Sequence, residues 1–278
     1  MSPQPLDLSN VQIPTLPEVV TKLSAMVENP LVGIAEIGRT VREDAAMTTR
    51  LLRVANSATV GLSEPVLSVE QATATLGARA VRNLALQAAV IDLFEDLPST
   101  DELDIQLVWR HAILTAQVAQ LLATELKAGL PLAPDEYYSC GLVHDIGKLV
   151  LLQALGEEYL AVMHDARRNG KATHVAEQEE LGYTHVDVGA RVAAYWRLPP
   201  VLIEALQFHH GPLERIRADK SIAVVAFADQ IAYRVQAGAA DACVATLRPE
   251  AGRVLGIAPQ AFERIVAQAA ELWPTIQP

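Results

Sequence analysis

The sequence predicts an all-α protein, a helical bundle without a β-sheet, on three observations. Apolar residues recur at intervals of three and four along most of the chain, as they do on the buried face of a helix. The composition is 51% hydrophobic but only 5% aromatic, so alanine, leucine, valine and isoleucine must form the core, and this mixture favours helix. No segment alternates strictly between apolar and polar residues, as a half-buried strand would.

The first half of the chain is expected to form five short helices after a flexible lead of residues 1–12. Pro14 and Pro17 bracket a turn, after which a helical repeat of apolar residues begins at Val19. Asp44 is a favourable N-cap for the third helix. The predicted helices cover residues 19–27, 32–42, 44–55, 68–77 and 80–94.

Polar residues refine two of these boundaries. Ser68 and Gln71 have the spacing of a capping box, in which the side chain of each residue accepts a hydrogen bond from the backbone of the other. Asn56 and Ser57 follow the apolar run of the third helix. They are interpreted as its C-cap region, because Asn ends helices readily, with the lining of a cleft as the alternative.

The polar stretch 95–100 is the best candidate boundary inside the chain, and Ser99 with Glu102 has the spacing of another capping box. The boundary divides an N-terminal helical subdomain, residues 13–98, from a second helical subdomain, residues 99–278, on which the first is expected to pack. Helices of the second subdomain are predicted over residues 107–126, 135–155, 157–168, 173–181, 185–196, 199–209, 219–236 and 260–273.

Charge and composition narrow the classes of partner. A net charge of −11 without any Lys or Arg run argues against a nucleic-acid partner and against attraction to anionic membranes. Cys140 and Cys243 lack the paired spacing of a metal knuckle, and Cys140 is expected in the core. The N-terminus lacks a signal-peptide pattern, and no apolar stretch is long enough to span a bilayer. We therefore expect a cytoplasmic protein.

Five histidines and two aspartates form the strongest candidate site. Imidazoles and carboxylates are ligands that iron, manganese and zinc prefer, and on an all-helical scaffold they must converge from separate helices. The polar pair His144–Asp145 interrupts an apolar stretch, and burying such a pair without a partner is costly. It can serve one metal, or two metals through a bridging carboxylate. The candidate ligands are His111, His144, Asp145, His185, His209, His210 and Asp229.

Several segments resemble a known family. GLVHDIGKL, residues 141–149, is similar to the signature of the HD superfamily of metal-dependent phosphohydrolases, in which His144 and Asp145 would be the eponymous ligands. RLLRVANS and VLSVEQATATLG resemble the N-terminal half of the HDOD family, the HD-related output domain. WRHAILTAQVAQLLA, LGYTHVDVGARVAAYWRLP and ALQFHHGP resemble its second half. The resemblance extends from about Ile13 to Ala232.

The resemblance implies a bacterial signalling or output module, often associated with receiver and cyclic di-GMP systems and without an established general catalytic activity. It also implies that the seven candidate ligands are those that the related HD-GYP phosphodiesterases use, with Lys148 at the position of a phosphate-facing lysine. The chain departs from those enzymes after His210, where GPLE stands in place of the loop that shapes their cyclic-dinucleotide pocket.

Three functions follow as hypotheses. The preferred one is a non-catalytic signalling module that binds a protein partner or a nucleotide such as cyclic di-GMP, with iron, manganese or zinc as a candidate cofactor. The alternative is a metal-dependent phosphohydrolase acting on a nucleotide or cyclic dinucleotide, with Asp145 and Lys148 as catalytic residues. The third is a structural scaffold whose histidines are buried in hydrogen bonds with no metal.

Other histidines and aromatic residues receive simpler interpretations. His164 and His174 lie on predicted surface helices and are expected to be solvated. Trp109 and Trp196 are adjacent to motif segments. They are interpreted as packing residues, with stacking on a base at a pocket rim as the alternative.

Overall fold

The computed structural model describes residues 13–27, 29–57, 60–97, 99–100, 104–126 and 129–276. Of these residues 75% are helical, and no β-strand occurs among them. The predicted all-α class is therefore confirmed.

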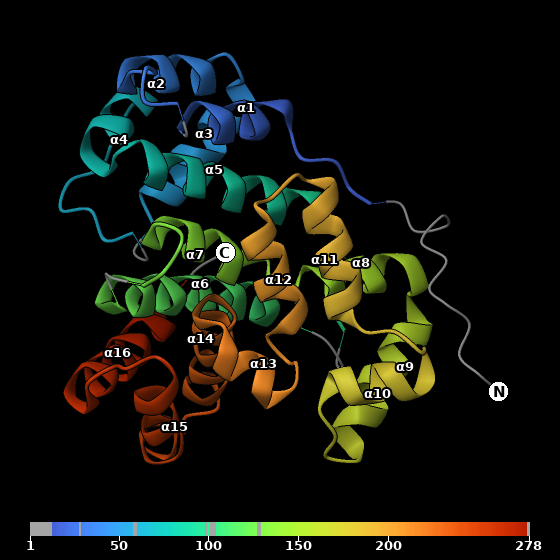
Figure 1. The fold of residues 1–278 in the computed structure, drawn as a ribbon. Coiled ribbons are helices and arrows are strands. Elements are labelled where there is room, and N and C mark those ends of the chain that lie inside the picture. Colours follow the sequence, from blue (N-terminus) through green and yellow to red (C-terminus); the bar gives the residue numbers. More distant parts are fainter. Residues whose placement is uncertain are drawn as a thin grey trace. The chain divides into compact units, whose positions relative to one another are not determined.

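The helices divide into two compact units (Figure 1). The small unit consists of Pro14–Asp96 and the end of the chain from Pro274, and the large unit is built from Leu97–Trp273. The expected subdomains, residues 13–98 and 99–278, and the packing of one on the other stay predictions.

The small unit contains the five helices that the apolar repeat predicts. Its α1 buries Val19, Val20 and Leu23, which are at most 7% exposed. Burying one such aliphatic side chain contributes about 1.5–3 kcal/mol. The helices are α1 (Glu18–Val27), α2 (Ile34–Arg42), α3 (Ala45–Ala55), α4 (Val69–Leu76) and α5 (Ala78–Leu93).

Side-chain hydrogen bonds fix both ends of α3. Asp44 Oδ1 accepts a hydrogen bond from the Met47 amide at 2.9 Å, as expected of an N-cap. Asn56 is the C-cap residue, and its side-chain amide pairs with both the N–H and the C=O of Val66. The C-cap interpretation of Asn56 is therefore confirmed, and the side chain also holds the loop that leads to α4.

The capping box expected at α4 is only half formed. The Ser68 hydroxyl accepts a hydrogen bond from the Gln71 amide at 3.0 Å, but Gln71 Oε1 accepts one from the Leu67 amide rather than from Ser68. Gly77 then ends α4 with a φ of 86°, a left-handed conformation that glycine adopts without steric cost.

The large unit is centred on three helices that pack against one another, α6, α7 and α14. Around them α11 packs on α8 and α12, and α15 packs on α16. The short α13 and the helix α15, which contains Pro249, are not among the predicted helices. The helices are α6 (Ile105–Leu126), α7 (Pro134–Val143), α8 (Ile146–Leu155), α9 (Glu157–Arg168), α10 (Thr173–Glu180), α11 (His185–Tyr195), α12 (Pro200–Phe208), α13 (Leu213–Ala218), α14 (Lys220–Gln236), α15 (Ala240–Val254) and α16 (Pro259–Leu272). The 3-10 helix η2 (Trp273–Thr275) begins at the last residue of the large unit.

The long helix α6 begins at Ile105, slightly before the predicted start at Leu107. Asp104 Oδ1 accepts hydrogen bonds from backbone amides of the first turn, and the Ser99 hydroxyl accepts one from the Ile105 amide at 3.2 Å. Glu102, the other half of the expected capping box, lies outside the described residues. None of the helices in the described ranges combines the length and the apolar composition that a membrane crossing requires.

The single helix predicted over residues 135–155 is wrong, because the chain forms two helices, α7 and α8, that meet at His144 and Asp145. Asp145 has a φ of −101° and a ψ of 11°, which lies outside the helical region. Neighbouring side chains on one continuous helix point about 100° apart. The break removes this constraint and lets both side chains point into the same interior site.

Two glycines beside this break allow helices to approach backbone to backbone. A Cβ at Gly141 would lie 2.7 Å from Cα of Ala116 on α6, and a Cβ at Gly147 would lie 1.9 Å from the carbonyl oxygen of His185 on α11. Neither distance is sterically allowed. The glycines therefore determine how closely α7 approaches α6 and α8 approaches α11.

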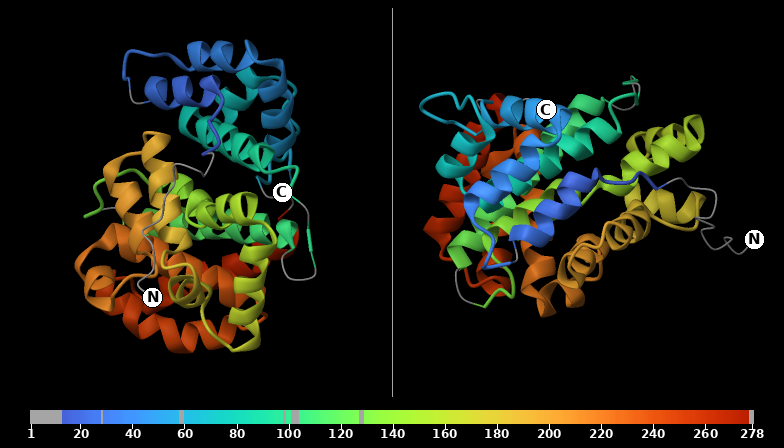
Figure 2. Two further views of the ribbon diagram at one scale, coloured as in Figure 1. Left: turned by 90° about the vertical axis from the view of Figure 1, so that its right-hand side faces the viewer. Right: turned by 90° about the horizontal axis from the view of Figure 1, so that it is seen from above.

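The helices α9 and α10 form a hairpin, in which they lie side by side (Figure 2). A small core holds the hairpin together, formed by Val162, Ala166 and Ala176 with Leu181 packed against them. α9 packs on α8, and α10 packs on α11. The hairpin thereby contacts the two helices that begin at the candidate site, α8 directly after Asp145 and α11 with His185.

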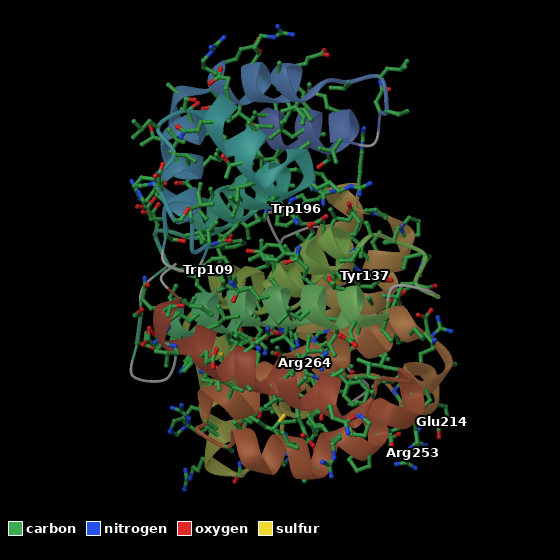
Figure 3. All side chains as sticks on the ribbon, turned by 90° about the vertical axis from the view of Figure 1, so that its left-hand side faces the viewer. Trp109, Tyr137, Trp196, Glu214, Arg253 and Arg264 are labelled. Atoms are coloured by element: carbon green, nitrogen blue, oxygen red, sulfur yellow. The ribbon has the colours of Figure 1, made fainter. Side chains whose placement is uncertain are left out.

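The large unit separates charged from apolar and aromatic side chains as a globular core requires. Glu214 and Arg253 are exposed, whereas Tyr137 is fully buried and its hydroxyl lies 2.8 Å from the Ser221 hydroxyl (Figure 3). Cys140 is fully buried, which confirms its expected core position.

Both tryptophans beside the motif segments are buried. Trp109 is 3% exposed and Trp196 is 7% exposed. Side chains so deeply buried serve packing, and this burial argues against the alternative of an aromatic ring at a pocket rim.

Candidate metal centre

The seven predicted ligands converge in the interior of the large unit. They come from the middle of two helices, α6 and α14, and from the ends of four others. Their ligand atoms form two groups, within each of which the atoms lie within 4.8 Å of one another. The first group is His111, His144 and Asp229, and the second group is Asp145, His185, His209 and His210.

In the first group, a carboxylate lies between two imidazoles. Asp229 Oδ1 is 3.1 Å from His111 Nε2 and 3.6 Å from His144 Nε2. Thr115, one turn after His111 on α6, places its hydroxyl 3.5 Å from the same Nε2 atom. The three ligand side chains are at most 12% exposed. The first group is therefore a compact and almost completely buried set of ligands.

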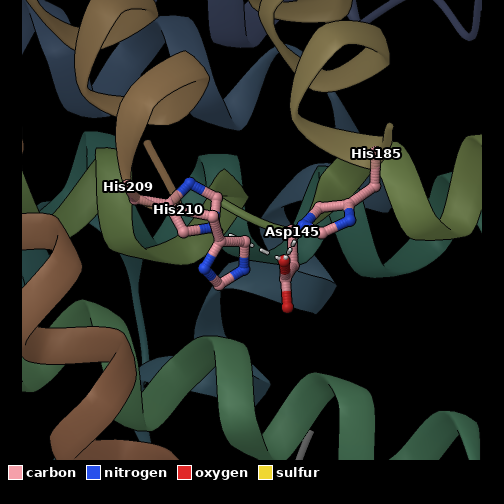
Figure 4. Close-up of side chains that lie close together, drawn as sticks. All are labelled: Asp145, His185, His209 and His210. Atoms are coloured by element: carbon pink, nitrogen blue, oxygen red, sulfur yellow. Dashed lines mark ion pairs between the residues drawn. The ribbon is translucent and has the colours of Figure 1, made fainter. Parts of the chain in front are cut away.

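In the second group, three imidazoles surround the carboxylate of Asp145 (Figure 4). His185 Nε2 is 3.2 Å and His209 Nε2 is 3.8 Å from Asp145 Oδ1. The ring of His210 lies 4.1 Å from that of His209, and its Nδ1 atom is 3.9 Å from Asp229 Oδ2. This second contact connects the second group to the first.

Asp145 faces both groups at once. Its Oδ1 atom points to the second group, whereas Oδ2 lies 3.3 Å from His144 Nε2 and 4.0 Å from His111 Nε2 of the first group. A carboxylate with one oxygen toward each of two ligand sets has the geometry of a bridge between two metal ions. Of the two roles that the sequence left open for the His144–Asp145 pair, this geometry fits the bridging one.

Hydrogen bonds on the outer side of three imidazoles orient their inner nitrogens. The Nδ1 atoms of His144 and His209 lie 2.7 and 2.6 Å from backbone carbonyl oxygens one turn earlier in the chain. The Nδ1 atom of His185 lies 2.7 Å from Glu177 Oε2. Because carbonyl and carboxylate oxygens only accept, each Nδ1 donates its N–H outward, and this directs each Nε2 to the interior.

Four atoms that face the interior make no well-aligned hydrogen bond among the described residues, and they lie near other ligand atoms of the centre, at distances down to 3.2 Å. They are the Nε2 atoms of His144, His185 and His209, together with Asp145 Oδ1, and all are buried. A buried polar atom left in this state costs about 1–3 kcal/mol. Divalent metals accept this set of donors, and outer-side hydrogen bonds to the imidazoles are the usual support of metal ligands. The residues present therefore fit a divalent metal.

The charges of the centre move the pKa values of two imidazoles in opposite directions. Burial alone lowers the pKa of His144, but the carboxylates of Asp145 and Asp229 raise it to about 10. Burial and the imidazole of His209 lower the pKa of His210 to about 2. Without metal, the first group therefore holds an additional proton on His144, whereas His210 is neutral and has one nitrogen lone pair available.

Lys148 is the cation nearest to the shared carboxylate. Its Nζ atom lies 2.6 Å from Asp145 Oδ2. Burial lowers the pKa of Lys148, but the carboxylate of Asp145 outweighs this effect and raises it, so the ammonium group stays charged. The side chain is 19% exposed, which makes it one of the more accessible groups of the centre.

Sequence reasoning missed Glu177, which is fully buried on α10. One of its oxygens accepts hydrogen bonds from both the backbone N–H and Nδ1 of His185, at 2.8 and 2.7 Å. The other oxygen accepts one from the Tyr159 hydroxyl at 2.6 Å. His185 and Tyr159 hold the pKa of Glu177 below its usual value although burial raises it. Glu177 is therefore the charged outer support of His185.

The expectation that His174 is solvated is wrong. Its side chain is half-buried, and its ring stacks on that of His210 with a centroid distance of 4.5 Å and an interplanar angle of 17°. The helix α10 points this residue inward because it packs on α11. His164 on α9 is 54% exposed, as expected.

The chain turns sharply after His210. The Gly211 amide donates to the carbonyl of Phe208 at 2.8 Å, and α13 begins at Leu213. A Cβ at Gly211 would lie 2.9 Å from the same carbonyl oxygen. The sequence GPLE thus forms a tight turn into a helix rather than an extended loop.

Comparison with known proteins identifies relatives of the whole arrangement. The family model of the HDOD domain matches residues 13–212. An uncharacterised protein from Treponema pallidum is 30% identical over 218 residues, which cover 78% of this chain and 41% of that protein. The chain thus spans less than half the length of this relative.

Solved structures show the same fold. An HDOD domain protein of unknown function from Geobacter sulfurreducens has a TM-score of 0.80 at 24% identity, and the match covers 96% of this chain and 93% of that one. The MmoQ response regulator from Methylococcus capsulatus has a TM-score of 0.55 at 26% identity, with 92% and 98% covered.

Proposed function

This chain belongs to the HDOD domain family, and from this premise we propose that it is a non-catalytic signal-transduction module whose large unit holds divalent metal. The observation that carries the proposal is the set of buried ligand atoms around Asp145 that make no well-aligned hydrogen bond among the described residues. The similarity to the MmoQ response regulator supports a role in signalling.

The metal would be iron, manganese or zinc, held by the two groups of ligands with Asp145 between them. Bound metal would balance the negative charge of the two carboxylates, and it would accept the lone pairs of the imidazole nitrogens that face the interior. The ligands come from six helices of the large unit, so a metal held by all of them would fasten these helices to one another. Metal occupancy would then control how rigid the large unit is.

Burial of the ligands favours a non-catalytic role. The side chains of His144, His185 and His209 are 0% exposed, and His210, the most open of the seven, is 23% exposed. A phosphoester must reach the metal directly to be hydrolysed. The tight turn after His210 also leaves out the loop that forms the substrate pocket in HD-GYP enzymes.

Such a module would pass its signal to a protein partner. The candidate ligand that triggers the signal is cyclic di-GMP or another nucleotide. An input of this kind acts only through different affinities for two arrangements of the protein. Binding of the nucleotide should therefore change both the metal affinity and the affinity for the partner.

Two measurements on the full chain test the proposal. Elemental analysis of protein purified without chelator should find iron, manganese or zinc at one or two equivalents, and Asp145→Ala should lose it. The metal-loaded protein should hydrolyse cyclic di-GMP and bis(p-nitrophenyl) phosphate no faster than Asp145→Ala. Absence of bound metal from the native protein would contradict the metal site, and turnover that depends on Asp145 would contradict the non-catalytic role.

One observation favours a second candidate function, a metal-dependent phosphohydrolase. Lys148 lies beside the shared carboxylate and is partly exposed, so its ammonium group could donate to a phosphoryl oxygen placed near Asp145. If this function is correct, Lys148→Met should abolish the Asp145-dependent turnover without removing the metal.

A further inference from the structure

The stacked pair of His174 and His210 is not explained by the ligand set itself. His174 belongs to neither group of ligands. Its ring nevertheless lies parallel to that of His210, with a centroid distance of 4.5 Å and an interplanar angle of 17°. Two rings stacked face to face cannot direct their lone pairs to a common ion between them. His174 therefore packs against His210 and does not supply a ligand atom.

His210 differs from the other two imidazoles of the second group, and from His144, in what orients it. A hydrogen bond to Nδ1 fixes the ring of His144, of His185 and of His209. No hydrogen bond fixes His210 among the described residues. Its ring instead contacts three imidazoles, at 4.1 Å from His209, 5.3 Å from His185 and 4.5 Å from His174. Only the contact with His174 is a parallel stack.

One helix supports two ligands of the second group. Glu177 on α10 binds His185, and His174 lies three residues earlier, on the same face of the helix. The hairpin of α9 and α10 has its own small core and joins the large unit through α8 and α11. It therefore brings both contacts to the second group from outside.

We propose that His174 is a positioning residue, whose stacked ring holds His210 in the orientation that completes the second group. The stack takes the place of the hydrogen bond that orients the other three imidazoles. This inference rests on the proposed function, because it requires that the second group binds metal.

The test is a Mn²⁺ titration of chelator-treated full chain, followed by the EPR signal of free Mn²⁺. His111→Ala serves as the background, because it disables the first group and leaves the second to report. In this background His174→Ala should weaken Mn²⁺ binding about tenfold, the lower end of what outer supports of metal ligands contribute. His174→Phe keeps a stacking ring but has no nitrogen, and it should bind within about threefold of the background protein.

Two controls separate positioning from a general structural effect. His164→Ala removes an exposed histidine from the same hairpin and should leave Mn²⁺ binding unchanged. In a protein that also carries His210→Ala, the His174→Ala change should have no further effect, because the ring that it positions is gone.

The outcomes distinguish this inference from the proposed function. If His174→Ala binds Mn²⁺ as the background does, or if His174→Phe is as weak as His174→Ala, the positioning role is wrong while the metal site stands. If native protein with both groups intact binds no Mn²⁺, iron or zinc, the proposed metal site fails and this inference fails with it. Tenfold loss with rescue by phenylalanine supports the positioning role.

Discussion

The two groups of ligands use the same residue types but obtain their geometry in different ways. In the first group, His111 and Asp229 lie in the middle of α6 and α14, helices that pack on each other at the centre of the large unit. In the second group, all four residues lie at helix ends: Asp145 precedes α8, His185 begins α11, and His209 and His210 follow α12. Packing therefore orients most of the first group, in which His144 alone lies at a helix end and has its own hydrogen bond, whereas individual contacts orient the second group.

This difference shows what a ligand at a helix end requires. A residue in the middle of a buried helix inherits its position from the many contacts of that helix. A residue at a helix end has a less constrained backbone and needs a partner of its own. Glu177 provides it for His185, a backbone carbonyl provides it for His209, and the His174 ring is the inferred partner of His210. Substitutions should therefore affect the two groups unequally.

The largest effect is expected from the residue that the groups share. Asp145→Asn keeps the shape of the side chain but removes the charge that faces both groups, so Mn²⁺ binding should weaken on the order of 100-fold or more at both. Asp165→Asn, at an exposed position on α9, is the matched control. Loss of only one of two Mn²⁺ equivalents would show that Asp145 does not connect the groups.

The next effect concerns how the second group is held between helices. Gly147→Ala would place a Cβ 1.9 Å from the His185 carbonyl oxygen and push α8 away from α11. We expect a loss of about 1–3 kcal/mol in the free energy of unfolding, measured in urea, and weaker metal binding by the second group. Gly252→Ala on α15 meets its nearest atom at 3.6 Å and should be neutral or slightly stabilising. Equal stabilities for the two variants would contradict the close approach.

A smaller change tests the outer support of His185 alone. Glu177→Gln leaves an acceptor oxygen for Tyr159 but turns an NH2 group, which cannot accept, toward His185, so metal affinity of the second group should fall about 10- to 100-fold. The first group, measured with His209→Ala as background, should be unaffected. Glu179→Gln changes an exposed carboxylate on the same helix and serves as the control. A loss in both groups would show that α10 acts on the whole centre.

The smallest effect is a difference in pH dependence between His144 and His210 in chelator-treated protein. The pKa of His144 is raised to about 10 in the folded state, above an unfolded value of about 6.5, so its stabilising contribution is complete below pH 6.5 and is lost as the pH rises toward 10. The pKa of His210 is lowered to about 2, so the unfolded chain takes up a proton that the folded chain does not, and stability falls as the pH drops below about 6.5.

Urea unfolding between pH 5 and 9 measures this difference. The stability advantage of native protein over His144→Gln should shrink as the pH rises from 7 to 9. The stability of His210→Gln should rise relative to that of native protein as the pH falls from 7 to 5. Each slope is at most about 1.4 kcal/mol per pH unit. Slopes of the same sign for both variants would remove the electrostatic distinction between the groups.

The fold class and the convergence of the candidate ligands follow from sequence because they depend on local signals. Apolar periodicity predicts the five helices of the small unit, and Asp44 and Asn56 cap α3 as their residue types suggest. The ligands are recognisable because a polar pair within an apolar stretch is costly to bury without a purpose. The break between α7 and α8 leaves no such signal, since the residues around His144 and Asp145 are all compatible with one continuous helix.

The supporting residues could not be predicted, because their roles depend on tertiary contacts. Glu177 stands in the acidic sequence EQEE with Glu179, and the two residues are locally alike. In the folded chain the Glu177 side chain is 0% exposed and that of Glu179 is 53% exposed. His174 resembles any surface histidine until α10 packs on α11. Such residues can be identified only from the side chain that each of them contacts in the folded protein.

The carboxylate of Asp145 has a thermodynamic consequence. Each of its oxygens serves a different set of nitrogens, so an ion that draws the carboxylate toward one set changes what remains for the other. If metal binds at both positions, reciprocity requires that occupancy at either one changes the affinity at the other by the same factor. A protein so built would fill its two positions cooperatively or antagonistically rather than independently, and its response to metal supply would be steeper or shallower than that of two separate sites.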